Sequence, residues 1–133
     1  MSWKGVKSQS IKAEIEAWCE DMGIKNYTVN LQGEIEVDEY VNLDGRDIKE
    51  LPYKFGRVNG YFSVNNCSLI SLKNCPEILY DFFDCNNNED LDSLNYIPKK
   101  VCGNIHCRDC KRKFTEEEVR SLCEVEARYL IYN

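Results

Sequence analysis

The spacing of apolar residues changes along the chain and predicts a helix, then a hairpin, then a series of repeats. Residues 10–22 place apolar side chains every three or four positions, which is the spacing of one face of an α-helix. Ser10 is a typical N-cap, and Gly23 is a typical stop in the left-handed conformation. Within residues 27–37, apolar and polar positions alternate around a Gln-Gly turn, which predicts a β-hairpin.

An internal repeat of 21–22 residues is the most informative feature of the sequence. Each unit has a short strand with two inward positions, a polar turn of Asn, Asp or Gly, and an L-x-x-L step behind the strand. We assign the one extra residue of the third unit to the run Asn86-Asn87-Asn88. The inward pairs are Val41/Leu43, Phe62/Val64, Phe83/Cys85 and Ile105/Cys107, and the steps are Ile48/Leu51, Leu69/Leu72 and Leu91/Leu94. One unit cannot bury its own apolar side, but about three stacked units can.

These patterns predict an α+β fold: a short leucine-rich-repeat-like solenoid of about 3–4 units with short parallel strands. We expect the N-terminal helix and the hairpin to cover the first unit. A C-terminal helix over 116–124 would close the last, with Thr115 as the N-cap of a capping box and Val119, Leu122 and Cys123 as its apolar stripe. Residues 128–132 fit either a strand or more helix. The prediction is a single domain, 1–133, divided into 1–26 (helix cap), 27–40 (hairpin), 41–110 (repeats) and 111–133 (C-terminal cap).

The second unit carries the pattern V-N-G-Y-F over 58–62, followed by Asn66, Leu69, Ser71-Leu72 and Pro76. With the G-x-I-x-V lead-in at 33–37, Val41-Asn42-Leu43 and the L-P-Y-K-F-G step at 51–56, it resembles small proteins of tailed bacteriophages that carry degenerate leucine-rich-like units. The resemblance covers residues 27–123 and departs from the pattern at Asp81, where the neighbouring units have Gly60 and Gly103. It implies the solenoid and a phage-like origin, and it supplies no catalytic residues. It also implies a host or defence protein as partner and the cytoplasm of a bacterial host cell as location.

Composition supports a folded protein with reduced thiols. Of 133 residues, 43% are hydrophobic, which is enough for a core. No apolar run approaches the roughly 20 residues of a membrane span, and the first residues lack the apolar region of a signal peptide. Eight cysteines are too few for a small disulfide scaffold of this length. We therefore expect an intracellular protein with no membrane partner.

The cysteines near residue 105 suggest an alternative function as a metal or redox module. Cys107-x-x-Cys110 has metal-ligand spacing, and Cys102, Cys123 or His106 could complete a zinc site. The spacing Cys102-x4-Cys107-x2-Cys110 also matches part of an iron–sulfur pattern. However, the repeat already explains Cys107 as an inward residue, and its strand neighbour His106 points to the opposite face. We therefore predict no cofactor and keep the metal or redox module as the alternative.

Charge is distributed unevenly along the chain. Residues 99–113 contain six cations and one acid, a net charge of +5, so the rest of the chain carries −11. No recognition helix or stacking platform accompanies the cations, so nucleic acid is an unfavoured partner. An acidic surface could instead imitate a nucleic-acid backbone and occupy a basic groove. Its candidate residues on the repeats are Asp81, Asp84, Glu89, Asp90 and Asp92.

No catalytic motif accompanies the single histidine, His106, so the sequence predicts a protein that is not an enzyme. The predicted function is a non-enzymatic protein-binding module, specifically a phage inhibitor or modulator of a host or defence protein. A solenoid binds through exposed strand and turn residues, and aromatic side chains are the usual anchors. The oligomeric state stays open. The candidate binding residues are Tyr61, Ser63, Phe82, Asp84, Glu89, Asp92 and His106.

Overall fold

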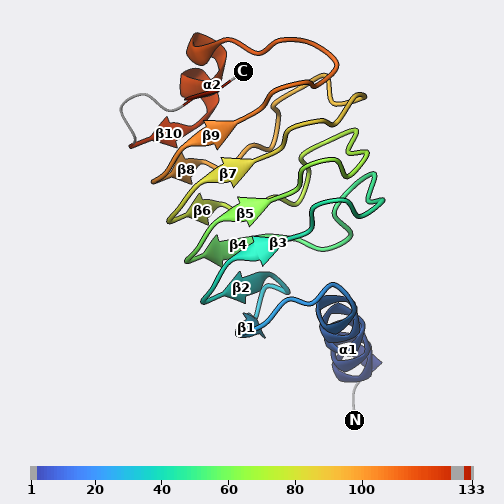
Figure 1. Cartoon of the computed structure of the whole chain (residues 1–133). Helices are drawn as coiled ribbons and strands as arrows, with labels where there is room; N and C mark the ends of the chain where they lie inside the picture. The colour runs from blue at the N-terminus through green and yellow to red at the C-terminus, as the bar shows by residue number, and fades with distance from the viewer. Residues whose placement is uncertain (1–2, 127–130, 133) are drawn as a thin grey trace.

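The computed structural model describes residues 3–126 and 131–132. Its main body is a β-solenoid of about four turns (Figure 1). Helix α1 (Trp3–Asp21) lies at one end of the solenoid, and helix α2 (Glu116–Leu122) lies at the other. No helix within the described residues is long and apolar enough to cross a membrane.

Each full turn contributes one short strand to each of two sheets. The six-stranded sheet has the order β1-β2-β4-β6-β8-β10, and the five-stranded sheet has the order β11-β9-β7-β5-β3. The first consists of β1 (Tyr27–Val29), β2 (Ile35–Val37), β4 (Phe55–Val58), β6 (Ile78–Leu79), β8 (Lys100–Val101) and β10 (Glu124–Val125). The second consists of β3 (Val41–Asn42), β5 (Phe62–Ser63), β7 (Phe83–Asp84), β9 (Ile105–His106) and β11 (Ile131–Tyr132). Among these strands only β1 and β2 pair antiparallel, as the predicted hairpin.

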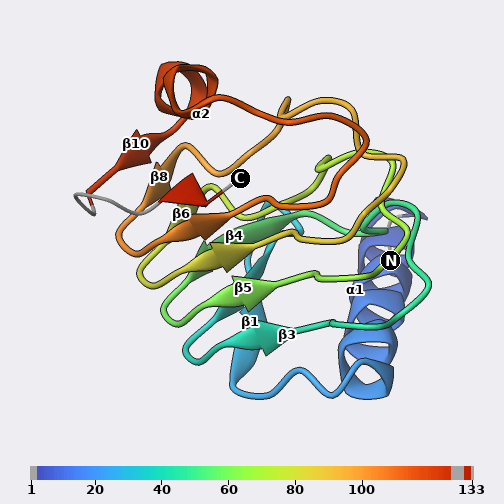
Figure 2. The ribbon, with the colours of Figure 1, turned by 45° about the horizontal axis from the view of Figure 1, so that its top comes forward.

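The strand register of the five-stranded sheet follows the sequence repeat. Val41 pairs with Phe62, Phe62 with Phe83, and Phe83 with Ile105. Figure 2 shows the successive turns of the solenoid stacked one above another. All four predicted inward pairs are buried, and aromatic rings of neighbouring turns stack inside the core. The prediction of parallel strands in this register is therefore confirmed.

The second strand of each unit was not predicted. Val58, Leu79 and Val101 are 21 and 22 residues apart and so occupy equivalent positions of the repeat, but they lie in β4, β6 and β8 of the six-stranded sheet. Two of these strands have only two residues, so they contain no alternation of apolar and polar positions that a sequence pattern could register. The L-x-x-L steps lie in the stretches between the two sheets.

The turn after each strand of the five-stranded sheet repeats the same backbone conformation. Its second residue has a positive φ angle in every unit: 78° at Gly45, 54° at Asn66, 59° at Asn87 and 57° at Asp109. Gly, Asn and Asp are the residues that tolerate this left-handed region best. The polar turns of the sequence are therefore a steric requirement of the fold.

One side chain in each turn points inward and donates to the strand carbonyl of the preceding turn. The three bonds are Cys67 to Leu43, Asn88 to Val64, and Cys110 to Cys85. This pattern makes Asn88 the equivalent of Cys67 and Cys110. The extra residue of the third unit therefore lies at 89–90, and its assignment to Asn86-Asn87-Asn88 was wrong.

The N-terminal helix begins at Trp3, seven residues before the predicted start, so Ser10 lies inside the helix and its prediction as the N-cap was wrong. Only part of the predicted apolar face is buried. Ile15 and Cys19 are buried, and Trp18 packs edge-to-face against Phe55. Ile11 belongs to the predicted face but is 43% exposed, because it lies beside an open hollow between the helix and the hairpin tip, which includes Leu31.

The C-terminal helix begins as predicted and ends two residues earlier. The Thr115 side chain accepts a hydrogen bond from the backbone N–H of Glu118 (3.0 Å). Val119 and Cys123 are buried, whereas Leu122 is 43% exposed, so its place in the apolar stripe was wrong. Seven residues make only two turns of helix, which is too short to bury three positions. In the predicted strand-or-helix segment, residues 131–132 form a strand, and 128–130 lie outside the described residues.

Candidate functional site

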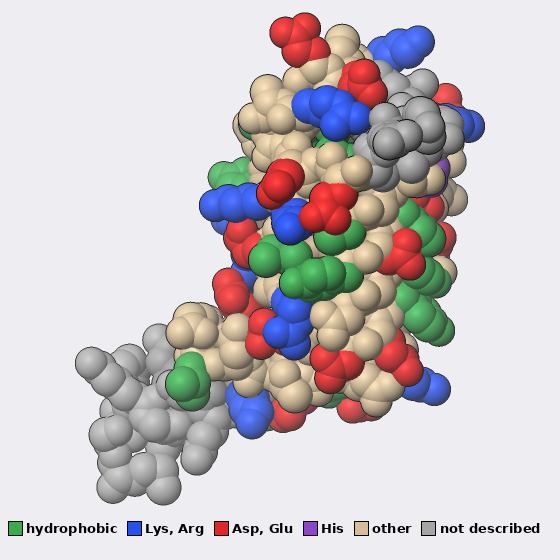
Figure 3. All heavy atoms as spheres, turned by 90° about the vertical axis from the view of Figure 1, so that its left-hand side faces the viewer, with side chains coloured by type: hydrophobic (Ala, Val, Ile, Leu, Met, Phe, Trp, Pro, Cys, Tyr) green, Lys and Arg blue, Asp and Glu red, His purple; other side chains and the backbone are tan. Residues whose placement is uncertain are grey.

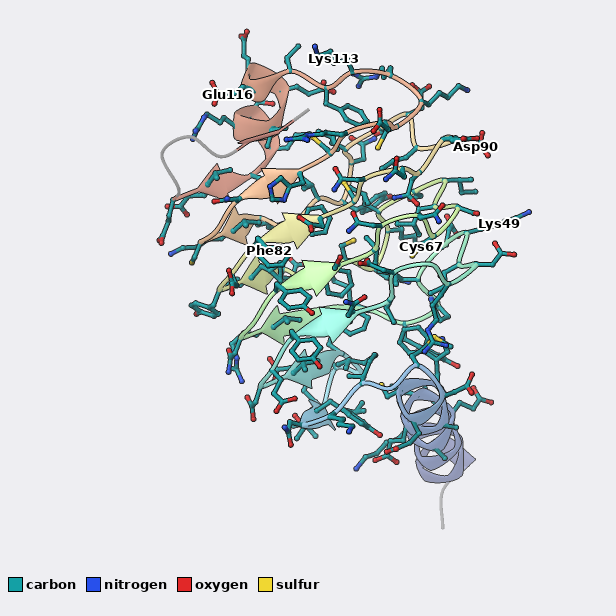
Figure 4. The ribbon with its side chains drawn as sticks, viewed as in Figure 1. Lys49, Cys67, Phe82, Asp90, Lys113 and Glu116 are labelled. Atoms are coloured by element: carbon teal, nitrogen blue, oxygen red, sulfur yellow. The ribbon has the colours of Figure 1, made fainter. Side chains whose placement is uncertain are left out.

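Three aromatic side chains stack on the outer surface beside the five-stranded sheet. Tyr40 and Tyr61 lie with ring centroids 4.9 Å apart and planes 10° from parallel. Tyr61 and Phe82 are closer, at 4.5 Å and 6°. We call Tyr40, Tyr61 and Phe82 the aromatic column; Phe82 is labelled in Figure 4, and Figure 3 shows a column of hydrophobic side chains along one edge of the molecule.

The 21-residue repeat produces this stacking, and a glycine allows the first two turns to approach closely. The three rings are 21 residues apart, so the parallel register sets one turn directly above the next. Gly60 precedes Tyr61 at a tight corner, where an added Cβ would lie 2.8 Å from the backbone nitrogen of Tyr40. Gly103 occupies the same corner in the fourth unit, where an added Cβ would lie 2.6 Å from the backbone nitrogen of Phe82. These distances show that no side chain fits at either corner, and the coils approach closely there.

Polar side chains line the column on the adjoining strand positions. His106 Nδ1 is hydrogen-bonded to Asp84 Oδ1, and the imidazole meets the Phe82 ring edge-on at 6.4 Å between centroids. The Asn42 amide donates to the Tyr61 hydroxyl (3.4 Å). The column therefore ends in a carboxylate–imidazole pair.

Ser63 lies on the same strand row but is only 3% exposed. Its hydroxyl donates to Asp44 Oδ1 (2.6 Å), and the same oxygen accepts from the backbone N–H of Asn65 (2.8 Å). Because Asp44 bends over from the preceding turn, Ser63 offers no exposed hydroxyl, contrary to the expectation for an outward strand position.

The stacking determines which ligands the column can bind. Tyr61 is covered on both faces by its neighbours, so it presents a ring edge to solvent. A nucleic-acid base needs an open ring face on which to stack. Ring edges carry partial positive charge and suit backbone carbonyls, carboxylates and apolar side chains. Tyr40, at the end of the column, is 52% exposed.

The structure brings together four of the seven predicted binding residues: Tyr61, Phe82, Asp84 and His106. Glu89 and Asp92 lie elsewhere, on the turn side marked by Asp90 in Figure 4. Asp92 pairs with Arg112 (3.5 Å), and Glu89 lines an open hollow with amide and carboxylate side chains. They therefore do not belong to the same surface as the aromatic column.

Tyr40 is the member of the column that the sequence did not identify. It lies outside the residues assigned to the first repeat unit, and its neighbours form an acidic stretch. The spacing of 21 residues before Tyr61 is the signal that would have revealed it.

The alternative metal ligands do not converge. Cys107 and Cys110 lie in the turn after β9, where Cys85 of the preceding turn is their neighbour. Cys102 lies beside Glu126, and the Cys123 thiol contacts the carbonyl of Glu124 (3.6 Å). Within the described part of the chain, no group of three or more His, Cys, Asp or Glu side chains could hold a metal ion.

The basic segment 99–113 does not form one patch. Lys99 and Lys100 lie at β8 and pair with Glu77 and Glu126. The other cations lie on the turn side, where Arg112 pairs with two acids and stacks 4.5 Å from the Phe114 ring centroid. The net charge of +5 on residues 99–113 is thus divided between two sides of the solenoid and partly neutralised by neighbouring acids.

The aromatic column with its Asp84–His106 pair is therefore the best-formed surface site among the described residues. Comparison with protein-family models, curated proteins and solved structures gave no match.

Proposed function

We propose that this chain is a non-enzymatic protein-binding module that binds its partner through the aromatic column and the Asp84–His106 pair. The observation that carries the proposal is the rigid stack of Tyr40, Tyr61 and Phe82 on the surface. Tyrosines and other aromatics dominate the binding energy of protein interfaces. Because the rings already hold one another in place, binding would cost little side-chain entropy.

The partner class follows from the resemblance to small phage proteins, which points to a host or defence protein that this chain inhibits or modulates. We also propose that the solenoid is of the leucine-rich-repeat-like type, and that helices α1 and α2 cap its two ends. Buried residues on both helices, Ile15 and Val119 among them, support this arrangement. Capped ends leave the sides of the solenoid as the surface for binding.

Affinity capture from a bacterial lysate with matched variants tests the proposal. The test variant is Tyr61→Ala with Phe82→Ala, and the control is Tyr80→Ala with Tyr96→Ala, which removes two exposed tyrosines outside the column. We expect wild type and control to retain the same protein and the test variant to lose it by tenfold or more. Circular dichroism would verify that both variants are folded. Equal capture by all three, or recovery of nucleic acid alone, would overturn the proposal.

A further inference from the structure

Two cysteines from neighbouring turns of the solenoid, Cys85 and Cys110, lie in contact beneath the polar turns, and Cys107 is nearby. Cys110 Sγ lies 3.3 Å from the backbone oxygen of Cys85, and the two thiols are hydrogen-bonded to each other. Cys107 is the register partner that follows β9, as Cys85 follows β7. Cys85 and Cys107 are fully buried, whereas Cys110 is partly exposed. Any reagent from solvent therefore reaches Cys110 first.

Cys110, which is partly exposed, is one of the residues that line a cationic hollow on the surface. The hollow has a volume of about 430 Å³ and is lined by residues 108–113, which include four cations and one acid, Asp109. Arg112 is engaged by Glu118 and Asp92, while Lys111 and Lys113 are exposed at the rim. Such a surface attracts small anions toward the thiol.

Exposure and hydrogen bonding distinguish Cys110 from the other two cysteines. As a thiol, Cys110 donates to the carbonyl oxygen of Cys85 (3.3 Å). Hydrogen bonds from the Cys85 thiol and the backbone of Asn88 lower the pKa of Cys110 despite its partial burial. The same contact and complete burial raise the pKa of Cys85, and burial raises that of Cys107 to about 12. Among these three cysteines only Cys110 is partly exposed, and a thiolate must reach the reagent to attack it, so Cys110 is the reactive member of the three.

We propose that Cys110 is a redox-modification site that reacts with a small anionic disulfide of the glutathione class and passes the oxidation to Cys85. In the first step the Cys110 thiolate attacks one sulfur of the reagent, and one glutathione thiolate leaves with the bonding electron pair. In the second, the Cys85 sulfur attacks Cys110 Sγ, and the Cys85 proton passes to the departing glutathione sulfur. A Cys85–Cys110 disulfide forms and the second glutathione leaves as a thiol. Two protein thiols are oxidised and one reagent disulfide is reduced to two thiols.

Cys102 provides an internal control because it is the other partly exposed cysteine. It lies beside Glu126, and burial together with that carboxylate raises the pKa of Cys102. At neutral pH Cys102 should therefore remain a thiol and react slowly, although a reagent can reach it.

Incubation of the reduced, folded protein with oxidised glutathione, followed by intact mass and peptide mapping, tests the proposal. Wild type and Cys102→Ser should both form the Cys85–Cys110 disulfide, with the loss of two hydrogens. Cys85→Ala should accumulate one glutathionyl group on Cys110, and Cys110→Ser should acquire none. Lys111→Glu with Lys113→Glu should slow the reaction several-fold at low salt, since the rim cations attract the reagent.

Each contrary result refutes a specific step. Faster modification of Cys102 than of Cys110 would overturn the assignment of the reactive thiol. A stable glutathionyl adduct on wild-type Cys110 with no internal disulfide would overturn the role of Cys85. Absence of both products after prolonged incubation would overturn the site altogether. The Cys85→Ala and Cys110→Ser variants are each read by mass, so a modest loss of stability leaves the test intact.

Discussion

Replacing Asn88 should destabilise the solenoid more than any other polar substitution in its turns. Asn88 is completely buried, and its Oδ1 accepts from the backbone N–H groups of Cys67 (3.0 Å) and Leu69 (3.1 Å). Its amide nitrogen donates to the carbonyl oxygens of Val64, Cys85 and Asn86. One side chain thus connects the backbones of two adjacent turns.

Asn88→Ala leaves two buried N–H donors without their acceptor. Each buried, unsatisfied donor costs about 1–3 kcal/mol, so the free energy of unfolding should fall by about 2–6 kcal/mol. Domains of this size are stable by about 5–15 kcal/mol, so the variant should lose a large fraction of its stability. Asn88→Cys retains one donor, as Cys67 does in the preceding turn, and should lose less.

Urea unfolding followed by the fluorescence of Trp18, which packs in the core against Phe55, measures the change. The midpoint should fall by about 1 M or more with an unchanged slope. The matched control is Asn95→Ala, an exposed turn residue, which should change stability by less than about 0.5 kcal/mol. A loss below about 1 kcal/mol for Asn88→Ala would refute the reasoning, because the two donors would then have found other partners.

Three further predictions concern the backbone and the charges. Gly60→Ala adds a Cβ 2.8 Å from a backbone nitrogen of the preceding turn, so urea unfolding should show a loss of about 1–3 kcal/mol. Tyr96 has a φ of 70°, where Asn74 stands in the previous unit, so Tyr96→Asn should raise stability by about 1 kcal/mol in the same assay. Arg112 lowers the pKa of Glu118, so the pair stabilises the fold above the ordinary carboxyl pKa of about 4.3. That stabilisation should disappear as pH falls through the lowered value, and Glu118→Gln should flatten this part of a stability–pH curve.

The interior of the fold could be predicted from the sequence because every stacked unit has to bury its apolar side chains in the same way. Each unit must place apolar side chains at the same two strand positions, so the spacing of 21–22 residues identified Phe62, Phe83 and Ile105 as register partners. The role of Thr115 as an N-cap could also be predicted, because the first backbone N–H groups of a helix need a side-chain acceptor.

The second sheet and Asn88 could not be predicted, and the reason is physical in each case. Two-residue strands such as β6 and β8 contain no alternation, so only their hydrogen bonds to neighbouring turns define them. Asn87 and Asn88 are adjacent asparagines in the same turn, and the sequence does not distinguish them. Asn87 faces solvent, whereas the Asn88 side chain points inward. Which of the two enters the core depends on the turn conformation.

Surface positions are determined by more than the repeat, in contrast to interior positions. This explains why only four of the seven predicted binding residues lie together in the site. Inward positions are fixed by the repeat alone, but an outward position is shaped by the turns on either side. Ser63 is outward in sequence yet covered by Asp44 from the preceding turn, whereas Asp84 one turn later pairs with His106. The aromatic column exists because three successive units carry a ring at one outward position and the parallel register places these rings one above another. The surface that this fold presents therefore depends on the outward residues of adjacent turns taken together.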